Sequence, residues 1–424
     1  MHQDTIFALA SGRPPAAIAI IRITGPTAHL AATTLAGDLP ATRRAALRTL
    51  RHNGDVLDEA LVLRFDRPQS ATGEDVVEFH CHGGRAVVDA VLKALSSLAG
   101  VRAAVPGEFT RRAFSNGRID LTEAEGLADL LEAETESQRR AALALSGGGL
   151  RRQVEVWQSQ ILGLSAQAEA AIDYDDQDVG KVEQEFSEAI HELARDLESW
   201  LLKPRIEPLK DGIRVVLAGP PNAGKSSLLN AIAGSEKAIV TETAGTTRDT
   251  IEVPLSVAGQ PMIFIDTAGM RESTDVVENI GIARAQASVT SADVLLWLGE
   301  DPPPEHRKAI WLQPRCDLAG RSTVTAGRLP VSAKTGYGIT DLIERISCEV
   351  RQMLPADGAV VINQRQALAI GEAASALTSL KTPADLILIA EVLRSARLAF
   401  DKLTGRAGFD DVLDHLFGRF CLGK

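Results

Sequence analysis

The chain has 424 residues, of which 45% are hydrophobic and 24% charged, and its formal net charge is -11 at pH 7. This length predicts about two to four domains, and the acidic balance argues against a general nucleic-acid coat, although basic residues can still cluster locally. Four widely spaced cysteines fit a reducing compartment and offer no zinc site. No stretch reaches the ~20 apolar residues of a membrane span, and no secretory signal is recognisable, so we expect a cytoplasmic protein that does not engage a membrane.

Residues 1–118 have the pattern of a mixed α/β domain. Apolar and β-branched runs predict strands at residues 16–23, 61–65 and 76–80. Apolar residues at helical spacing predict a helix at residues 85–98. The run His80-Cys81-His82 offers three types of metal ligand. Because successive side chains of an extended segment point to opposite faces, they cannot all bind one ion, and we interpret the run as structural.

Residues 119–208 are rich in Ala, Leu and Glu at helical spacing, which predicts an all-α domain. Thr122 and Glu125 match a capping box at the start of the first helix. We interpret the acidic run at 173–178 as a solvated loop between helices and residues 204–212 as a linker. The helices are predicted over residues 121–145, 151–172 and 182–202.

A helical pattern returns in the last part of the chain, residues 352–424. Helices are predicted there over residues 364–380, 384–403 and 409–417. Helical segments therefore flank residues 209–351 on both sides. This arrangement predicts that residues 209–351 form a domain inserted into a helical one.

The strongest motif lies at Gly219–Ser226, which matches the phosphate-binding pattern G-x-x-x-x-G-K-[ST]. An apolar run at 213–218 predicts a strand before it, and residues 227–232 predict a helix after it. In such a loop the backbone N–H groups point at phosphate oxygens, Lys225 reaches the β- and γ-phosphates, and the Ser226 hydroxyl ligates Mg²⁺. A glycine-rich turn with a chance Lys-Ser pair is the alternative, which the strand–loop–helix context disfavours.

Three further segments complete the pattern of a nucleotide site. A loop at 241–249 contains threonines of the kind that close over Mg²⁺ and sense the γ-phosphate. A predicted strand at 261–265 leads into an Asp-Thr-Ala-Gly run, which offers a carboxylate near Mg²⁺ and a glycine amide at the γ-phosphate. Residues 332–334 resemble the guanine-contacting loop of small GTPases. The residues predicted to bind GTP are Asn222, Ala223, Gly224, Lys225, Ser226, Ser227, Thr241, Glu242, Thr243, Ala244, Gly245, Thr246, Thr247, Asp266, Thr267, Ala268, Gly269, Asp317, Ser332, Ala333 and Lys334.

The segment that specifies guanine departs from the usual N-K-x-D. Its counterpart is Pro314-Arg315-Cys316-Asp317, in which Asp317 still offers two oxygens to the guanine N1–H and N2–H groups. Pro314 has no side-chain amide, and Arg315 replaces the lysine that packs along the base. We expect guanine to be preferred over adenine with weakened affinity. An ATPase is the competing interpretation.

The chain as a whole resembles the bacterial tRNA modification GTPases of the MnmE (TrmE) family. The resemblance spans nearly all residues and is carried by Asp4–Ile6, Ile20–Gly25, Thr72–Asp75, Pro106–Phe109, Asn116–Leu121, Gly245–Asp249 and Cys421–Lys424. It implies an α/β P-loop GTPase domain inserted into an all-α helical domain, preceded by an α+β folate-binding domain that forms a homodimer.

The resemblance also implies the reaction. The family forms a heterotetramer with an FAD- and NADH-dependent MnmG-type subunit and adds a (carboxymethyl)aminomethyl group at C5 of the tRNA wobble uridine, U34. The one-carbon unit comes from 5,10-methylenetetrahydrofolate or 5-formyltetrahydrofolate. A GTPase switch or ribosome-assembly factor, which binds partners without chemistry on RNA, is the alternative function.

Site residues follow from the same resemblance where the motifs match. Folate is expected at Arg22, Glu78, Arg118 and Lys424, K⁺ at Asn222, Thr241, Thr243 and Thr246, and Mg²⁺ at Ser226 and Thr247. Met270 stands where many regulatory GTPases have a water-orienting glutamine, and Glu278 matches the family's glutamate for that task. Cys421 is expected to act as a catalytic thiolate near the folate.

Three pairs of basic residues are candidates for contacts with tRNA phosphates. They are Arg43-Arg44, Arg111-Arg112 and Arg151-Arg152. A solvated charged surface explains each pair about as well.

Overall fold

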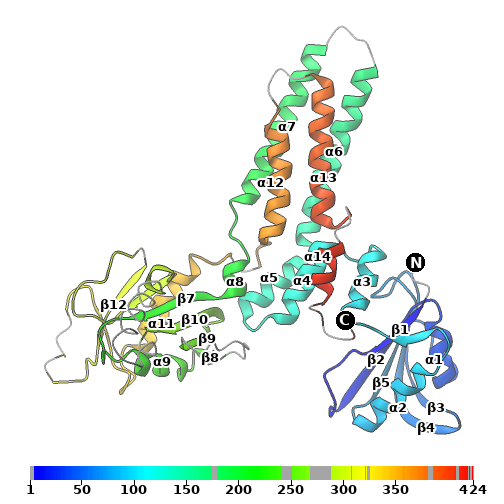
Figure 1. The fold of residues 1–424 in the computed structure, drawn as a ribbon, viewed down its shortest axis with the longest axis horizontal. Coiled ribbons are helices and arrows are strands. Elements are labelled where there is room, and N and C mark those ends of the chain that lie inside the picture. The colour runs from blue at the N-terminus through cyan, green and yellow to red at the C-terminus, as the bar shows by residue number, and fades with distance from the viewer. Residues whose placement is uncertain are drawn as a thin grey trace, which may run out of the picture. The chain divides into compact units, whose positions relative to one another are not determined.

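The computed structural model describes residues 4–173, 179–240, 251–267, 288–306, 308–319, 321, 325–356, 358–380, 385–406, 410–418, 420 and 423. The chain forms two compact units, and each unit combines segments that are far apart in the sequence. The first contains residues 1–128, 151–163 and 394–424, and the second contains residues 129–150 and 164–393. Figure 1 labels most of the helices and strands.

The first unit contains a six-stranded sheet in the order β3-β4-β5-β2-β1-β6 (Figure 1). Helices α1 (Ala28–Ala36) and α2 (Arg85–Ser96) cover one of its faces, and side chains such as Ile21, Val62 and Phe79 are fully buried beneath them. The strands are β1 (Thr5–Leu9), β2 (Ile18–Thr24), β3 (Ala45–His52), β4 (Asp55–Phe65), β5 (Val76–His82) and β6 (Val101–Ala103).

The strands predicted at 16–23, 61–65 and 76–80 are confirmed within β2, β4 and β5, and the helix predicted at 85–98 is confirmed as α2. β1, β3 and β6 were not predicted. β3 is the edge strand of the sheet, and Leu50 is its only fully buried residue. Because most of its side chains are accessible to solvent, its sequence can mix leucine with arginine. A propensity pattern is weak for such a strand.

The run His80-Cys81-His82 lies in β5 and has the structural role predicted for it. Cys81 faces the core and is buried, whereas His82 faces solvent and its Nδ1 lies 2.7 Å from Asp58 Oδ1. Burial raises the pKa of the Cys81 thiol to about 12. The three side chains therefore do not share one ligand position.

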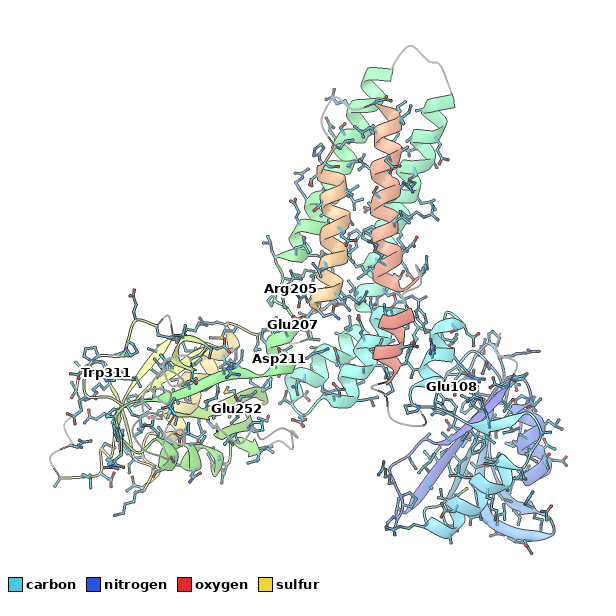
Figure 2. The ribbon with its side chains drawn as sticks, viewed as in Figure 1. Glu108, Arg205, Glu207, Asp211, Glu252 and Trp311 are labelled. Carbon is cyan, nitrogen blue, oxygen red and sulfur yellow. The ribbon has the colours of Figure 1, made fainter. Side chains whose placement is uncertain are left out.

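An ion-pair network surrounds Arg112 on α3 (Glu108–Ser115), where the arginine side chain is fully buried. Its guanidinium donates to Asp4 Oδ1 at 2.9 Å, to Glu108 Oε1 at 3.1 Å and to Glu74 Oε2 at 3.2 Å. Arg102 adds bonds to Asp4 and Glu108, both at 2.6 Å. Burial alone would raise the pKa values of Asp4 and Glu108, but these arginines hold both below their ordinary range. Figure 2 labels Glu108.

Helices from both ends of the chain pack together in the first unit. Leu121 and Ala124 of α4 (Leu121–Glu132) contact Leu416 and Phe417 of α14 (Asp410–Gly418) in one buried cluster. The Trp157 ring of α6 (Gly149–Asp173) stacks on Phe400 of α13 (Leu386–Thr404), with ring centroids 5.6 Å apart. Segments separated by almost 300 residues thus share one core.

The single helix predicted at 121–145 is instead two helices, α4 and α5 (Glu136–Ser146). Thr135 caps α5 through a capping box with Gln138, which ends the continuous helical path before it. The capping box predicted for Thr122 and Glu125 was wrong. Asp120 accepts from the Glu123 amide and Glu123 Oε2 accepts from the Asp120 amide, both at 2.9 Å, so the helix begins two residues earlier than that pattern indicated.

The remaining predicted helices are confirmed, with shifts at their ends. Residues 151–172 fall within α6, and the helix predicted at 182–202 is α7 (Val179–Leu201), which packs against α12 (Gln364–Thr378). The helices predicted at 384–403 and 409–417 are α13 and α14. The predicted linker at 204–212 contains the short helix α8 (Glu207–Asp211). None of the helices in the described ranges is long and apolar enough to span a bilayer.

The second unit contains a seven-stranded sheet in the order β13-β12-β11-β7-β10-β9-β8. The strands β13, β12, β11, β7 and β10 run parallel, and β9 and β8 complete one edge in antiparallel fashion. Helices α9 (Lys225–Ala233) and α11 (Ile339–Arg351) pack on one face over buried strand residues. The strands are β7 (Ile213–Ala218), β8 (Ala238–Val240), β9 (Ile251–Val257), β10 (Gln260–Asp266), β11 (Val294–Trp297), β12 (Ala309–Pro314) and β13 (Leu329–Val331).

The chain enters and leaves this sheet domain at the same place. Arg205 and Ile362 pair as an isolated parallel bridge, and the Ile206 amide donates to the Ile362 carbonyl at 3.2 Å. The two connections to α7 and α12 therefore lie side by side.

Candidate nucleotide-binding site

The loop at 219–224 connects the carboxyl end of β7 to the first turn of α9. Gly219 has φ 146°, and a Cβ there would lie 3.1 Å from the Leu298 carbonyl carbon, so no larger residue fits without a shift. Asn222 and Gly224 adopt positive φ values of 59° and 97°. These turns bring the loop around to the N-terminus of α9, where backbone N–H groups and the helix dipole favour an anion. The predicted strand–loop–helix context is confirmed.

Lys225 and Ser226 occupy the first turn of α9. The Lys225 side chain is buried, and its Nζ donates to the carbonyls of Gly219 and Pro220, each at 3.0 Å. The ammonium group thus lies inside the loop that would enclose the phosphates. Its position fits the predicted role in binding phosphate oxygens.

Asp266 lies beside the loop because β10 pairs with β7 in a register that aligns Asp266 with Leu217. The Ser226 hydroxyl donates to Asp266 Oδ2 at 2.5 Å, and Thr267 Oγ1 donates to the Leu217 carbonyl at 2.9 Å. Hydroxyl and carboxylate oxygens are the ligands that Mg²⁺ prefers. The residues present therefore fit a magnesium ion bound jointly with phosphates.

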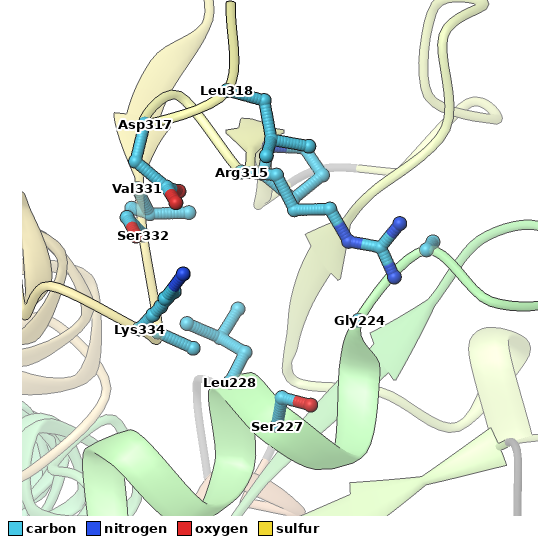
Figure 3. Close-up of a pocket in the computed structure, with 12 residues that line it drawn as sticks. Gly224, Ser227, Leu228, Arg315, Asp317, Leu318, Val331, Ser332 and Lys334 are labelled. Atoms are coloured by element: carbon cyan, nitrogen blue, oxygen red, sulfur yellow. The ribbon is translucent and has the colours of Figure 1, made fainter.

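A pocket of about 290 Å³ lies next to the loop (Figure 3). Ala223, Gly224, Ser227 and Leu228 form one side of it. Pro314, Arg315, Asp317, Leu318, Val331, Ser332, Ala333 and Lys334 form the other. The segments predicted to read the base are thus brought together with the phosphate loop, although about a hundred residues separate them in the sequence.

Asp317 carries the acceptor oxygens of this pocket. A hydrogen bond from Ser332, together with the charges of Lys334 and Arg315, holds the pKa of Asp317 below its ordinary value. An ionised carboxylate only accepts hydrogen bonds. It therefore matches the paired N1–H and N2–H donors of guanine, and adenine offers no such pair at these positions.

Arg315 crosses from the base-reading segment to the phosphate loop. It adopts φ 57°, and its Nη2 donates to the Asn222 carbonyl at 2.6 Å. Figure 3 shows the guanidinium pointing toward Gly224. Arg315 thus restrains the phosphate loop, while Asp317 lines the pocket. The planar guanidinium of Arg315 can also stack on a base.

Gln313 is a supporting residue that the sequence interpretation missed. It is buried at the end of β12, its Nε2 donates to the Arg321 carbonyl at 2.7 Å, and its Oε1 accepts from the Thr325 amide at 3.0 Å. These bonds hold the segment that follows Asp317. The sequence signal for this role was the side-chain amide of Gln313, one residue before the position of the asparagine in N-K-x-D.

Twelve predicted site residues lie outside the described residues. They are Thr241, Glu242, Thr243, Ala244, Gly245, Thr246, Thr247, Ala268, Gly269, Glu278, Cys421 and Lys424.

The predicted folate residues Arg22 and Glu78 face each other on the sheet surface that α1 and α2 leave open. They are aligned across β2 and β5, and Arg22 Nε donates to Glu78 Oε1 at 2.9 Å. The Arg22 guanidinium also lies 5.8 Å from the centre of the Phe109 ring. This side of the sheet thus holds a charged pair beside an aromatic ring.

The Arg118 side chain of the same unit packs against the turn at Gly73. Within the described ranges, no hydrogen bond or ion pair joins Arg118 to Arg22 or Glu78. At the chain end, a Cβ on Gly423 would lie 2.3 Å from the Leu9 carbonyl oxygen. The C-terminal glycine therefore packs directly against the end of β1.

Known proteins and family models match this chain over nearly its whole length. The family model for the GTP-binding protein TrmE N-terminus matches residues 5–118, and that for the MnmE helical domain matches residues 121–421. The chain is 52% identical to the tRNA modification GTPase MnmE of Erythrobacter litoralis over 426 residues, covering 100% of both chains. It is 49% identical to that of Novosphingobium aromaticivorans over 435 residues, covering 99% of this chain and 100% of the relative. The chain therefore belongs to the family of tRNA modification GTPases named MnmE.

Proposed function

We propose that this GTPase adds a (carboxymethyl)aminomethyl group at C5 of the tRNA wobble uridine, together with an FAD- and NADH-dependent subunit. GTP hydrolysis would drive the conformational cycle, and a tetrahydrofolate would supply the one-carbon unit. The observation that carries the proposal is the presence of two different sites in one chain: the guanine pocket at Asp317 and the Arg22–Glu78 pair on the open sheet face. A GTPase switch or assembly factor has no use for the second site.

The Arg22–Glu78 pair suits a folate by its chemistry. A guanidinium pairs with the glutamate carboxylates of folate, and a carboxylate accepts from the donors of a pterin ring. We propose Arg118 and Lys424 as further basic groups of this site. Either 5,10-methylenetetrahydrofolate or 5-formyltetrahydrofolate meets these requirements.

We propose K⁺ as a second cation of the GTP site, held by Asn222, Thr241, Thr243 and Thr246, and we add Thr247 to Ser226 as a ligand of Mg²⁺. The conformation of Asn222 supports this proposal, because its φ is positive and its carbonyl accepts a hydrogen bond from Arg315 that holds the backbone in place. Glu278 would orient the attacking water, because Met270 cannot.

Replacement of K⁺ by Na⁺ is expected to slow GTP hydrolysis at least roughly tenfold, because a smaller cation would not reach the same ligands and stabilise charge on the phosphates. The measurement is phosphate release in matched KCl and NaCl buffers. Asn222→Ala should reduce the difference between the two salts. Equal rates in both salts would exclude the K⁺ site.

We further propose that the domains are residues 1–118, 119–208, 209–351 and 352–424, with the GTPase domain inserted into the helical one. The pairing of Arg205 with Ile362 supports this, because an inserted domain needs its entry and exit side by side. The assembly would be a homodimer within a heterotetramer with the MnmG-type subunit. The cytoplasmic location stays a prediction from the sequence.

Cys421→Ser is expected to abolish the wobble-uridine modification and to leave GTP hydrolysis unchanged, because a hydroxyl is a much weaker nucleophile and acid than a thiol. The test is mass spectrometry of tRNA nucleosides from cells that lack the gene and carry either the wild-type or the variant copy. Phosphate release by the purified variant is the control.

Two outcomes would contradict the proposal in different ways. Full modification by Cys421→Ser would remove the thiol from the mechanism but keep the function. Unchanged wobble uridine in the deletion strain would reject the modification itself and favour the assembly-factor alternative.

A further inference from the structure

Four arginines cluster on the edge strand of the N-terminal sheet. β3 is the outermost strand, Arg48 and Arg51 lie in it, and Arg43 and Arg44 directly precede it. Arg43, Arg44 and Arg51 are exposed. At ~3.3 Å per residue, an extended segment from Arg44 to Arg51 covers about 23 Å. An edge of this length passes several successive phosphates of a nucleic-acid backbone, and the arginines extend from both faces of the strand, because odd and even side chains point to opposite faces.

The positive charges of this row are not neutralised by carboxylates. Arg43 donates to the Gln69 carbonyl at 2.6 Å, and Arg48 donates to the carbonyls of Asp38 and Leu47 at 2.7 and 2.9 Å. The side chains of Arg44 and Arg51 make no hydrogen bond or ion pair to any described residue. Backbone carbonyls orient a guanidinium and leave its full charge in place.

The other basic pairs of the chain differ in this respect. Arg111 pairs with Asp414 at 2.8 Å, and Arg112 is buried among carboxylates. Arg151 bonds both Glu123 and Glu155 at 2.9 Å. Arg111, Arg112 and Arg151 are therefore compensated by carboxylates, whereas Arg43 and Arg44 form no ion pair with a described residue.

The charge balance of the N-terminal region agrees with this. Residues 1–118 contain fourteen Lys and Arg against eleven Asp and Glu, in a chain whose net charge is -11. The net charge of residues 1–118 is therefore +3, whereas that of residues 119–424 is -14. Such a local excess is the electrostatic pattern of a nucleic-acid contact.

A shallow hollow of about 650 Å³ lies at the end of the row. Thr34, Arg51, His52, Asn53, Gly54, Ser97 and Leu98 line it. His52 Nε2 lies 3.1 Å from Ser97 Oγ, so a ring nitrogen and a hydroxyl face each other beside Arg51. Guanidinium, imidazole, hydroxyl and amide groups are all suited to phosphate oxygens.

We propose that the edge of β3, from Arg43 to Arg51, binds the sugar-phosphate backbone of the tRNA substrate. The contact is independent of base sequence and orients the tRNA on the N-terminal domain. Charged residues on an edge strand also prevent pairing with other strands, so the test must separate RNA binding from solubility. The inference rests on the proposed function in tRNA modification, but it is tested by a different measurement, the binding of tRNA.

The test compares two double variants that remove the same charge. Arg44→Gln with Arg51→Gln removes two uncompensated arginines, whereas Arg139→Gln with Arg140→Gln removes two that pair with Glu136. Binding of an unmodified tRNA transcript with uridine at the wobble position is measured by fluorescence anisotropy over a series of KCl concentrations. The full-length protein is used throughout, and GTP hydrolysis reports on folding.

The first variant is expected to bind tRNA roughly 10- to 50-fold more weakly at low salt and to lower the slope of log K against log salt by about 1.5 to 2, since two phosphate contacts are lost. Arg44→Lys with Arg51→Lys should restore most of the slope. The control variant should match wild type. GTP hydrolysis should be unchanged in all of them.

Three results would overturn the inference: an unchanged slope in the first variant, an equal loss in the control variant, or wild-type protein that does not bind the transcript. None of these bears on the nucleoside analysis that tests the modification. Modification that persists with an unchanged slope would mean that the tRNA is held elsewhere.

Discussion

Asp317→Asn is expected to weaken GTP binding roughly 100- to 1,000-fold. Asp317 is ionised, faces the pocket and would accept two hydrogen bonds from guanine, and bonds to a charged group are each worth about 1.5–3 kcal/mol. Asparagine keeps one acceptor and places an N–H₂ donor against the guanine N2–H₂ donor. Because donor now faces donor, the loss exceeds that of one missing bond.

The same change is expected to improve binding of XTP, whose base has a carbonyl oxygen in place of the 2-amino group and so accepts from the new amide. Calorimetry with GTP, XTP and ATP on both proteins measures the switch. The arrangement assigned to the pocket would be wrong if the variant bound GTP as well as wild type does. Wild-type binding of GTP no tighter than ATP would reject guanine specificity altogether.

Arg112→Ala is expected to destabilise the N-terminal domain by about 3–5 kcal/mol, which lowers its thermal midpoint by on the order of 10–20 °C. The arginine is fully buried and holds Asp4, Glu74 and Glu108 together. Its removal leaves these carboxylates with only part of their compensating charge, and the alanine leaves a cavity as well. Thermal unfolding followed by calorimetry measures the shift of this domain's transition.

The neighbouring Arg111→Ala is the matched control. Arg111 is partly exposed and makes one ion pair, to Asp414 at 2.8 Å, so its loss should cost less than about 1 kcal/mol. Similar midpoints for the two variants would mean that the buried network does not stabilise the domain.

Arg111 and Arg112 also illustrate what local pattern does not reveal. They are adjacent and chemically identical, yet one lies at the surface and the other is surrounded by carboxylates from two distant segments and from its own helix. Helical periodicity places them on different faces, but it does not say which face meets Asp4 and Glu74. The three basic pairs looked equivalent for the same reason.

The base pocket shows the same division. Asp317 and Lys334 were predicted from short motifs, because the chemistry of guanine restricts which residues can serve. The contact of Arg315 with Asn222 was not predicted, since it depends on the left-handed turn at Arg315 and on the approach of a loop about ninety residues away in sequence. The supporting bonds of Gln313 depend on how the following segment folds back.

The sequence by itself determined the phosphate loop, the strand before it, most helices and the family, because glycine positions, apolar periodicity and charged motifs act over a few residues. Only the tertiary structure decided that Asp266 meets Ser226, that Arg22 faces Glu78, and that the arginines of β3 keep their charge. Each of these depends on strand register or on which carboxylates come near. Register and proximity are set by the packing of whole layers, which no short window of sequence contains.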